Sequence, residues 1–368
     1  MEQELHAVTM KDLRRMLETF WELRSTQYGA PALVVEGPPG IGKSEAMLSF
    51  MVDKKCHGRI FHPLFREPVD LTGVPSVVAS KIKSVAMDDL GPTDMMGTPA
   101  MAFGRTVWNA PSWLPKKEDV DGVFDIEELG ACEPTMQKAC ARILYERMIG
   151  DHPLPKSWIV VATTNSAAHK AGSFRLLTHL CSRVVRVNLV VDAIEWLQWG
   201  SATGRIHRKV RGYIAFKSSE LHGFDPDKPG QYPCPRSWEL LSRALDPLPN
   251  HLLPAYAAGC VGAGAASGFV AFCELEDKLP KAETIIAAPL KTSVPTEPSV
   301  LCAVGEMLAE HCRDKGEKVL SAAMAYLGRI KSGEYSLLAG RALYFANPTV
   351  INMKEFSPWL SQLAKLTQ

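Results

Sequence analysis

An eight-residue stretch near the start of the chain narrows the choice of folds further than any other part of the sequence. It consists of Gly37, Pro38, Pro39, Gly40, Ile41, Gly42, Lys43 and Ser44. This pattern, GxxxxGK[ST], follows an apolar run at 32–35 and precedes a helix-prone segment at 45–50. Strand, glycine-rich loop and helix are the context in which the pattern cradles phosphate groups. We therefore expect an α/β fold that contains a P-loop.

The residue types in this stretch match the chemistry of phosphate binding. Glycines let backbone N–H groups turn toward the phosphates, and the N-terminus of the following helix adds positive potential. The Lys43 ammonium can reach the β- and γ-phosphates, and the Ser44 hydroxyl can bind Mg²⁺. The motif alone predicts a nucleotide phosphate and does not separate a kinase, a GTPase, a motor and a switch.

Two adjacent acids follow a β-prone run at 122–126, as a second nucleotide-binding strand requires. Glu128 is the candidate general base for water, and Glu127 is the candidate for the Mg²⁺ side. Asp is usual at the Mg²⁺ position, so Glu127 is a departure that could shift the metal geometry and slow hydrolysis. Asp125 is an alternative metal-side residue, although it stands two positions earlier. A solvated acidic turn without chemistry is the other interpretation.

A polar residue, Asn165, follows a buried β run at 158–164. At the end of that strand its amide could position the water that faces the γ-phosphate. Taken alone, Asn165 would be interpreted as a turn residue. Because it comes after two nucleotide-binding motifs, we treat it as a candidate site residue.

Several motifs in order carry a resemblance to a known family. GPPGIGKS, GVFDIEEL, VVATTN, LCSRVV and CPRSWE resemble the MoxR-like group of AAA+ ATPases, particularly its phage-type members and the related CbbQ/NorQ group. The stretches LTGVP, GRTVWNAPSWLP and ERMIGDHPLPKSW are similar to that group as well, so the resemblance covers about residues 30–250. It implies a P-loop AAA+ parallel sheet flanked by helices, a helical lid, ATP and Mg²⁺ as ligands, and ATP hydrolysis.

The resemblance also implies roles for single residues. The loop from Gly37 to Ser44 matches Walker A, the two acids at 127 and 128 match Walker B, and Asn165 matches sensor 1. Arg183 matches the arginine finger that reaches a neighbouring subunit, with Arg175 as its rival, although Val184 replaces the Phe often found after that Arg. Arg236 matches sensor 2 at the start of a lid helix. An arginine finger requires an oligomer, so a ring is implied, hexameric in this family.

The spacing of hydrophobic residues divides the chain into four segments. We expect an N-terminal helix at 1–30, an α/β nucleotide-binding domain at 31–190, a helical lid at 191–250 and a mostly helical region at 251–368. The expected strands lie near 58–64, 120–127, 158–164 and 183–189, and a loop insertion lies at about 65–118. From the resemblance, loops of that insertion approach a ring pore, where Lys81, Lys83, Met95 and Met96 could contact substrate; surface loops packed on the domain are the alternative. The last segment is interpreted as an oligomerisation or partner-docking region.

Charge and hydropathy limit the partners. Lys and Arg number 41 and Asp and Glu 40, which disfavours a nucleic-acid coat but leaves room for a local basic groove. The basic run at 205–211 is the best candidate for such a groove, and a solvated helix face is the preferred interpretation. The uncharged run at 252–273 is long enough to cross a bilayer, but it is rich in Ala, Gly and Ser and predicts a packed helix pair. An odd number of cysteines, nine, without a CxxC pair fits reduced thiols in a cytoplasmic protein.

Three functions remain open at this point. The first is an ATP-driven ring that remodels or assembles a protein partner, which the resemblance suggests could contain a von Willebrand A domain. The second is a nucleic-acid motor or clamp-loader-like module, which the near-zero net charge disfavours. The third is a nucleotide-gated scaffold with little turnover, to which the Glu127 departure points.

Overall fold

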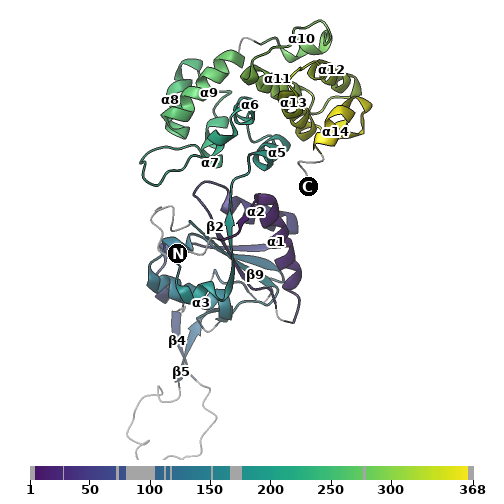
Figure 1. Ribbon diagram of the computed structural model, residues 1–368. Coiled ribbons are helices and arrows are strands. Elements are labelled where there is room, and N and C mark those ends of the chain that lie inside the picture. The colour runs from purple at the N-terminus through teal and green to yellow at the C-terminus, as the bar shows by residue number, and fades with distance from the viewer. Residues whose placement is uncertain are drawn as a thin grey trace, which may run out of the picture. The chain divides into compact units, whose positions relative to one another are not determined.

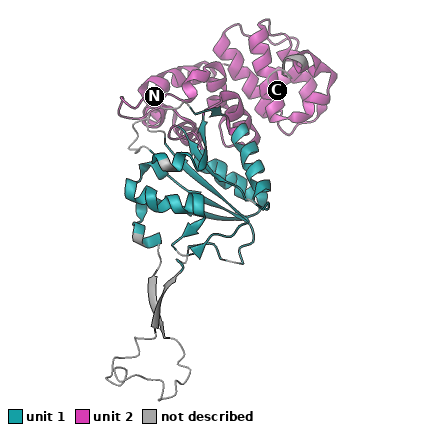
Figure 2. Ribbon diagram, turned by 60° about the horizontal axis from the view of Figure 1, so that its bottom comes forward, with its two compact units in different colours: residues 1–8, 12–37, 43–189 teal, residues 9–11, 38–42, 190–368 magenta. Residues whose placement is uncertain are grey.

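The chain divides into two compact units in its computed structural model (Figure 2). One unit comprises residues 1–8, 12–37 and 43–189, and the other comprises 9–11, 38–42 and 190–368. The structure describes residues 5–27, 29–71, 74–79, 104–111, 113–116, 118–150, 152–165, 176–276 and 279–363. Lys81, Lys83, Met95, Met96 and Arg175 lie outside the described residues, so the pore-contact prediction stays a prediction.

A six-stranded sheet forms the centre of the first unit. Its order is β1-β10-β2-β9-β6-β3, and neighbouring strands pair in parallel. The strands span Ala7–Val8 (β1), Val184–Leu189 (β10), Ala32–Glu36 (β2), Trp158–Thr164 (β9), Gly122–Ile126 (β6) and His57–Phe61 (β3). The middle strands β2, β9 and β6 are buried along their whole length, as expected of a parallel sheet covered on both faces.

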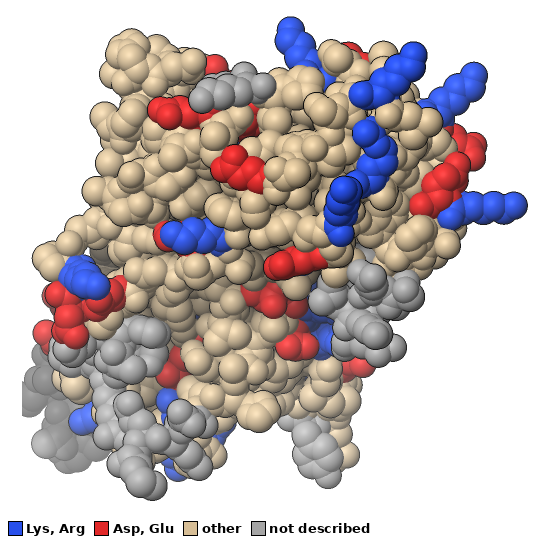
Figure 3. Space-filling view, turned by 45° about the horizontal axis from the view of Figure 1, so that its top comes forward, with Lys and Arg blue, Asp and Glu red and all other residues tan. Residues whose placement is uncertain are grey.

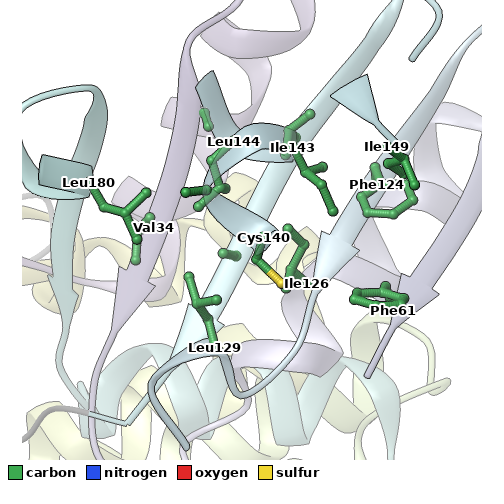
Figure 4. Close-up of a cluster of buried hydrophobic side chains, with 14 of the residues drawn as sticks. Val34, Phe61, Phe124, Ile126, Leu129, Cys140, Ile143, Leu144, Ile149 and Leu180 are labelled. Atoms are coloured by element: carbon green, nitrogen blue, oxygen red, sulfur yellow. The ribbon is translucent and has the colours of Figure 1, made fainter. Parts of the chain in front are cut away.

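Helices cover both faces of this sheet. Helices α1 (Met10–Leu23) and α2 (Lys43–Lys54) lie on one side, and α3 (Pro134–Glu146) lies on the other (Figure 1). The short helix α4 (Thr178–Cys181) leads into β10. On the α3 side, alternate residues of the strands such as Val34, Phe124 and Ile126 meet Cys140 and Ile143 of the helix in one apolar cluster (Figure 4). This core holds the carboxyl ends of the strands, where the predicted motifs begin, in fixed register.

Smaller elements complete the first unit. They are the antiparallel pairs β4 (Val74–Ala79) with β5 (Gly104–Asn109) and β7 (Met148–Ile149) with β8 (His152–Pro153), and the 3-10 turns η1 (Pro63–Phe65), η2 (Pro68–Leu71) and η5 (Leu129–Ala131). The strand expected at 58–64 ends earlier, at Phe61, because Pro63 starts η1 and cannot donate to a strand ladder.

The second unit is helical. Its helices are α5 (Ala193–Thr203), α6 (Arg208–Phe216), α7 (Pro235–Ser242), α8 (Leu253–Val261), α9 (Ala263–Glu276), α10 (Ala282–Ala287), α11 (Pro298–His311), α12 (Glu317–Leu327), α13 (Gly333–Ala346) and α14 (Ser357–Leu363). The 3-10 turns are η7 (Ser218–Leu221), η8 (Asn250–Leu252), η9 (Pro348–Asn352) and η10 (Lys354–Phe356).

The uncharged run at 252–273 forms the helix pair α8 and α9, as predicted. Gly262 separates the two helices with φ +82, a conformation that L side chains rarely adopt. Within the described residues, no helix has both the length and the apolar character needed to cross a membrane.

The expected fold class is confirmed: a parallel α/β sheet with a P-loop, flanked by helices, precedes a helical C-terminal region. One unit ends and the other resumes at 189/190. The finer division of the helical part at residue 250 stays a prediction.

Candidate nucleotide-binding site

The predicted P-loop joins β2 to α2. Gly40 and Gly42 have φ +78 and +97, so the backbone turns in a way that favours glycine at both positions. The Lys43 ammonium donates hydrogen bonds to the carbonyl oxygen of Gly37 at 2.8 Å and to Oδ1 of Asn165 at 2.9 Å. The half-buried Ser44 lies in the first turn of α2. The loop therefore has the glycine geometry, the cation and the helix N-terminus that a phosphate cradle needs.

The tip of the loop groups with the helical unit. The backbone N–H of Arg236, at the start of α7, donates to the carbonyl oxygen of Gly40 at 3.1 Å. A Cβ atom on Gly40 would lie 2.6 Å from Sγ of Cys234. Arg236, predicted at the start of a lid helix, is the second residue of α7, and its backbone N–H contacts residue 40. Its role as sensor 2 stays a prediction.

The three middle strands end beside one another. Asn165 directly follows β9, which lies between β2 and β6. The hydroxyl of Thr164, the last residue of β9, accepts a hydrogen bond from the backbone N–H of Gly130 at 3.0 Å. This bond connects the segment that follows β6 to the end of β9. The sheet therefore brings Lys43 and Asn165 into contact, with the two acids on the adjoining strand end.

Glu127 has a partner that the sequence analysis did not predict. Its carboxylate Oε2 lies 3.3 Å from Nδ1 of His62, and its side chain is 15% exposed. The backbone N–H of Glu127 donates to the carbonyl oxygen of Phe61 at 2.9 Å. His62 is the first residue after β3, the neighbour of β6. That position, one residue past a strand end, is the signal that could have identified it.

Asp125, the alternative metal-side residue, lies inside β6 rather than at its end. Its side chain is 1% exposed, and neither carboxylate oxygen has a hydrogen-bond partner in the described part of the chain. Burial holds the pKa of Asp125 well above its usual range, and the nearby charge of Glu127 raises that pKa further. Of the two, Glu127 is the acid at the strand end, where a phosphate-bound metal would be reached.

Glu128 has an unusual backbone conformation. It has φ +56 and ψ +36, the left-handed conformation, and its side chain is exposed. A residue other than glycine in this region carries strain, and such strain occurs often at functional sites. The conformation lets the chain leave β6 and start η5 within one residue, so that the side chain of Glu128 projects from the turn.

Of the two candidate arginine-finger residues, Arg183 is described by the structure and Arg175 is not. Arg183 immediately precedes β10, and its guanidinium lies 5.0 Å from the ring centroid of Tyr145. Its neighbour Val184 pairs with Ala32, at the start of β2, whereas the P-loop follows the end of β2. Arg183 therefore lies at the amino edge of the sheet, about 16 Å from the loop edge by strand rise. Arg175 is outside the described residues.

The basic run at 205–211 is only in part the solvated face that the sequence suggested, because Arg205 is exposed, Arg208 and Lys209 are half-buried, and Arg211 is buried. Arg211 is 1% exposed, and its guanidinium binds Glu306 at 2.7 Å and Glu310 at 2.5 Å. Arg208 pairs with the buried Glu276, and Arg205 pairs with Glu239 at 2.7 Å. The error has a physical cause, because the acids that take up these charges come from α7, α9 and α11, far along the chain.

The residues that are present fit a nucleoside triphosphate with Mg²⁺. Lys43 and the loop glycines supply the positive cradle, and Ser44 and Glu127 supply the hydroxyl and carboxylate oxygens that Mg²⁺ prefers. A further ion pair was not predicted from the sequence: the half-buried Arg186 binds the buried Glu36, the residue before the loop, at 2.6 Å. It connects the end of β2 to β10.

Among known proteins, only solved structures of low similarity resemble this chain. No protein-family model matches the sequence, and no curated protein matches it. Among solved structures, the chain is similar to the RuvB Holliday junction branch migration motor of Thermotoga maritima, with a TM-score of 0.39, 11% identity and 76% of each chain covered. It is also similar to NtrX from Brucella abortus in complex with ATP, with a TM-score of 0.31 and 13% identity over 100% of this chain and 70% of that one. Similarities this low carry no argument about function.

Proposed function

We propose that this chain is an AAA+ ATPase of the MoxR-like group, which binds ATP with Mg²⁺ in a ring of identical chains and uses hydrolysis to remodel or assemble a protein partner. The observation that carries the proposal is the hydrogen bond from Lys43 to Asn165 at the carboxyl edge of the sheet. It joins the first and third nucleotide motifs of the sequence, and the acids of the second motif end the adjoining strand. The order of the motifs along the chain supports the choice of group.

In this proposal each site residue has one task. Lys43 and the N–H groups of the loop hold the β- and γ-phosphates, and Mg²⁺ bound by Ser44 and Glu127 would offset phosphate charge. Asn165 orients the attacking water through its amide. Glu128 accepts the proton of that water as the oxygen attacks phosphorus, and the bond to the ADP oxygen breaks. The products are ADP and phosphate.

The position of Arg183 supports a ring. It lies at the edge of the sheet opposite the P-loop, so it cannot reach the phosphates held by its own chain. If Arg183 stabilises a transferred phosphoryl group, that group must then be held by a neighbouring chain, as is the case for arginine fingers that act in trans. A hexamer is the ring size that the resemblance implies.

Phosphate release from purified protein with ATP and Mg²⁺ tests the hydrolysis. We expect turnover in the unmodified chain, loss of ATP binding by about tenfold or more in Lys43→Ala because a charge-assisted contact is removed, and retained binding without turnover in Glu128→Gln. Lys54→Ala, a change of the same kind at the other end of α2, serves as the control. Failure of the unmodified chain to bind ATP would sink the proposal.

Mixing two inactive variants tests the ring. Lys43→Ala removes the cradle of one chain, and Arg183→Ala removes the finger that this chain offers its neighbour. In a ring of mixed chains, some interfaces join a chain with an intact Lys43 to a neighbour with an intact Arg183. The mixture should therefore release phosphate, although neither variant does so alone. Arg142→Ala, also an exposed arginine of the first unit, should stay active by itself. An inactive mixture would argue against the trans role of Arg183.

Partner remodelling is tested by affinity capture with Glu128→Gln in ATP, the variant that should hold the loaded state. Enrichment of a protein with a von Willebrand A domain, dependent on ATP and absent with Lys43→Ala, is the expected result. The movement that acts on the partner is assigned to the helical lid, with Arg236 as the residue that contacts the loop from that side.

A nucleotide-gated scaffold with little turnover is the second candidate, and one contact favours it. Glu127 replaces the usual Asp, and its carboxylate is held by His62. If wild-type phosphate release is as slow as that of Glu128→Gln while ATP still drives assembly, as measured by sedimentation velocity, the scaffold is the better description.

The nucleic-acid alternative loses its best support. Three arginines of the basic run, Arg205, Arg208 and Arg211, form ion pairs within the chain. On the face in Figure 3, Lys and Arg gather at the upper right, where acidic side chains lie beside them. A gel shift with single-stranded or duplex DNA that weakens steeply with salt would reopen this function.

A further inference from the structure

A cavity opens beside the end of the edge strand β3, within the first unit. Its volume is about 270 Å³, and its walls include four aromatic side chains and two arginines: Phe61, Phe65, Trp113, Phe124, Arg59 and Arg66. These six residues have no task in the proposed hydrolysis. His62, which lies 3.3 Å from Glu127, lines the cavity as well. Apart from His62, the cavity is a concave, largely aromatic surface for which the nucleotide site offers no explanation.

The floor of the cavity is buried, and one residue of its rim is exposed. Phe61 stacks on Trp113 with ring centroids 4.8 Å apart and lies 6.2 Å from the ring of Phe124, and both phenylalanines are buried. Phe65, in contrast, is 82% exposed. A large aromatic side chain left this open to water costs free energy that burial by another molecule would recover.

The two arginines differ in their pairing. Arg59 is neutralised by Asp119, to which its guanidinium donates at 3.1 Å. Arg66 is exposed and makes no ion pair with any residue in the described parts of the chain. Of the arginines that line the cavity in the described part of the chain, Arg66 alone is therefore available to a ligand.

We propose that this cavity binds a short segment of a protein partner in which an aromatic or branched aliphatic side chain stands next to an acidic residue. The apolar side chain enters between Phe61, Phe65 and Trp113, and the carboxylate pairs with Arg66. A volume of about 270 Å³ is ample for one large side chain and lies just below the roughly 300–1,000 Å³ of cavities for drug-sized ligands. This inference does not depend on ATP hydrolysis.

The charge of the residues around the cavity favours an acidic peptide segment over a nucleic acid. A single strand brings one phosphate for each base, and proteins meet it with a groove of several cations. Here one of the two arginines is already paired with Asp119, and the lining residue His62 lies 3.3 Å from the carboxylate of Glu127. One available cation matches one carboxylate.

Fluorescence anisotropy with three labelled peptides tests the proposal on the full chain without nucleotide. The probes are Gly-Ser-Gly-Phe-Glu-Gly-Ser, the same peptide with Lys in place of Glu, and the same peptide with Ala in place of Phe. We expect the Phe-Glu peptide to bind at least tenfold more tightly than the other two. Phe65→Ser should weaken its binding about tenfold, and Arg66→Glu should reverse the preference so that the Phe-Lys peptide binds better.

Lys138→Glu makes the same change of charge on the exposed surface of α3, away from the cavity, and should leave all three affinities unchanged. Equal binding of the three peptides, no binding of the Phe-Glu peptide, or an Arg66→Glu variant with the original preference would each overturn the proposal. Displacement of the Phe-Glu peptide by an oligothymidylate would overturn it too, in favour of a nucleic-acid occupant. Phosphate release of each variant, measured in parallel, separates this result from the fate of the ATPase proposal.

Discussion

The ammonium group of Lys43 donates a hydrogen bond to Oδ1 of Asn165 over 2.9 Å, across 122 residues of sequence. This bond makes the P-loop and the end of β9 parts of one site. It also means that the amide of Asn165 is held at a defined place relative to the loop, so its second polar group can be aimed at a water molecule.

Replacing Asn165 by Ala should slow phosphate release by about 10-fold to 100-fold, less than the loss of a general base would, because water is then positioned less well. ATP affinity should change little, since Lys43 keeps its charge and its bond to Gly37. Stopped-flow phosphate release and titration with a fluorescent ATP analogue measure the two effects. The half-buried Asn188, on β10, provides the control Asn188→Ala, and an unchanged rate in Asn165→Ala would remove Asn165 from the site.

Replacing Gly40 by Ala should weaken ATP binding by about tenfold or more. The new Cβ would lie 2.6 Å from Sγ of Cys234, and φ +78 disfavours any L residue by about 1–2 kcal/mol. Gly204→Ala is the matched control, because Gly204 has φ +67 but nothing within 4 Å. Both variants should lose stability in urea unfolding, and only Gly40→Ala should lose affinity. Equal affinities for ATP would show that the loop tip tolerates a side chain.

Replacing Arg211 by Met should cost about 3–5 kcal/mol of unfolding free energy, because Glu306 is then left as a buried charge without its partner. The double variant Arg211→Met with Glu306→Leu should recover a large part of this loss. Lys228→Met, which breaks an exposed pair with Asp225, should cost less than about 1 kcal/mol. A loss that small in Arg211→Met would mean that water reaches the pair. Urea unfolding at neutral pH measures all four proteins.

Stability should fall with acid partly through His207, the N-cap of α6. Burial lowers the pKa of His207 below its usual 6.5, and Asp246 offsets this only in part. The unfolded chain therefore binds the proton first, so the stability from this group is complete above about pH 6.5 and is lost as pH falls through the folded-state pKa. Asn can keep the cap, which in wild type accepts from the N–H of Lys209 at 3.1 Å.

The measurement is the unfolding free energy of wild type and His207→Asn from pH 8 to pH 5. The advantage of wild type over the variant should shrink below pH 6.5. His251→Asn, at an exposed position, should run parallel to wild type. A constant difference between wild type and His207→Asn over this range would contradict the assignment.

Much of the first unit could be predicted from the sequence, because its signals are local. The apolar runs at 122–126 and 158–164 form β6 and β9, and Asp192 caps α5 where the lid was expected to begin. The strand expected at 58–64 ends at Phe61 because Pro63 starts the turn η1. The basic run around Arg211 was misjudged because periodicity cannot show which distant acids will lie opposite it.

The sequence by itself determined the P-loop, the strand that precedes it and the polar residues at the ends of the next strands. Each of these depends on a few consecutive residues, whose backbone preferences and alternation are the same wherever they stand. Only the tertiary structure decided that Glu127 meets His62, that Gly40 meets Cys234 and that Arg211 is buried against Glu306. Those partners are far apart along the chain, and the packing of the sheet and helices brings them together. A buried charge or a close backbone approach is stable only against one particular neighbour.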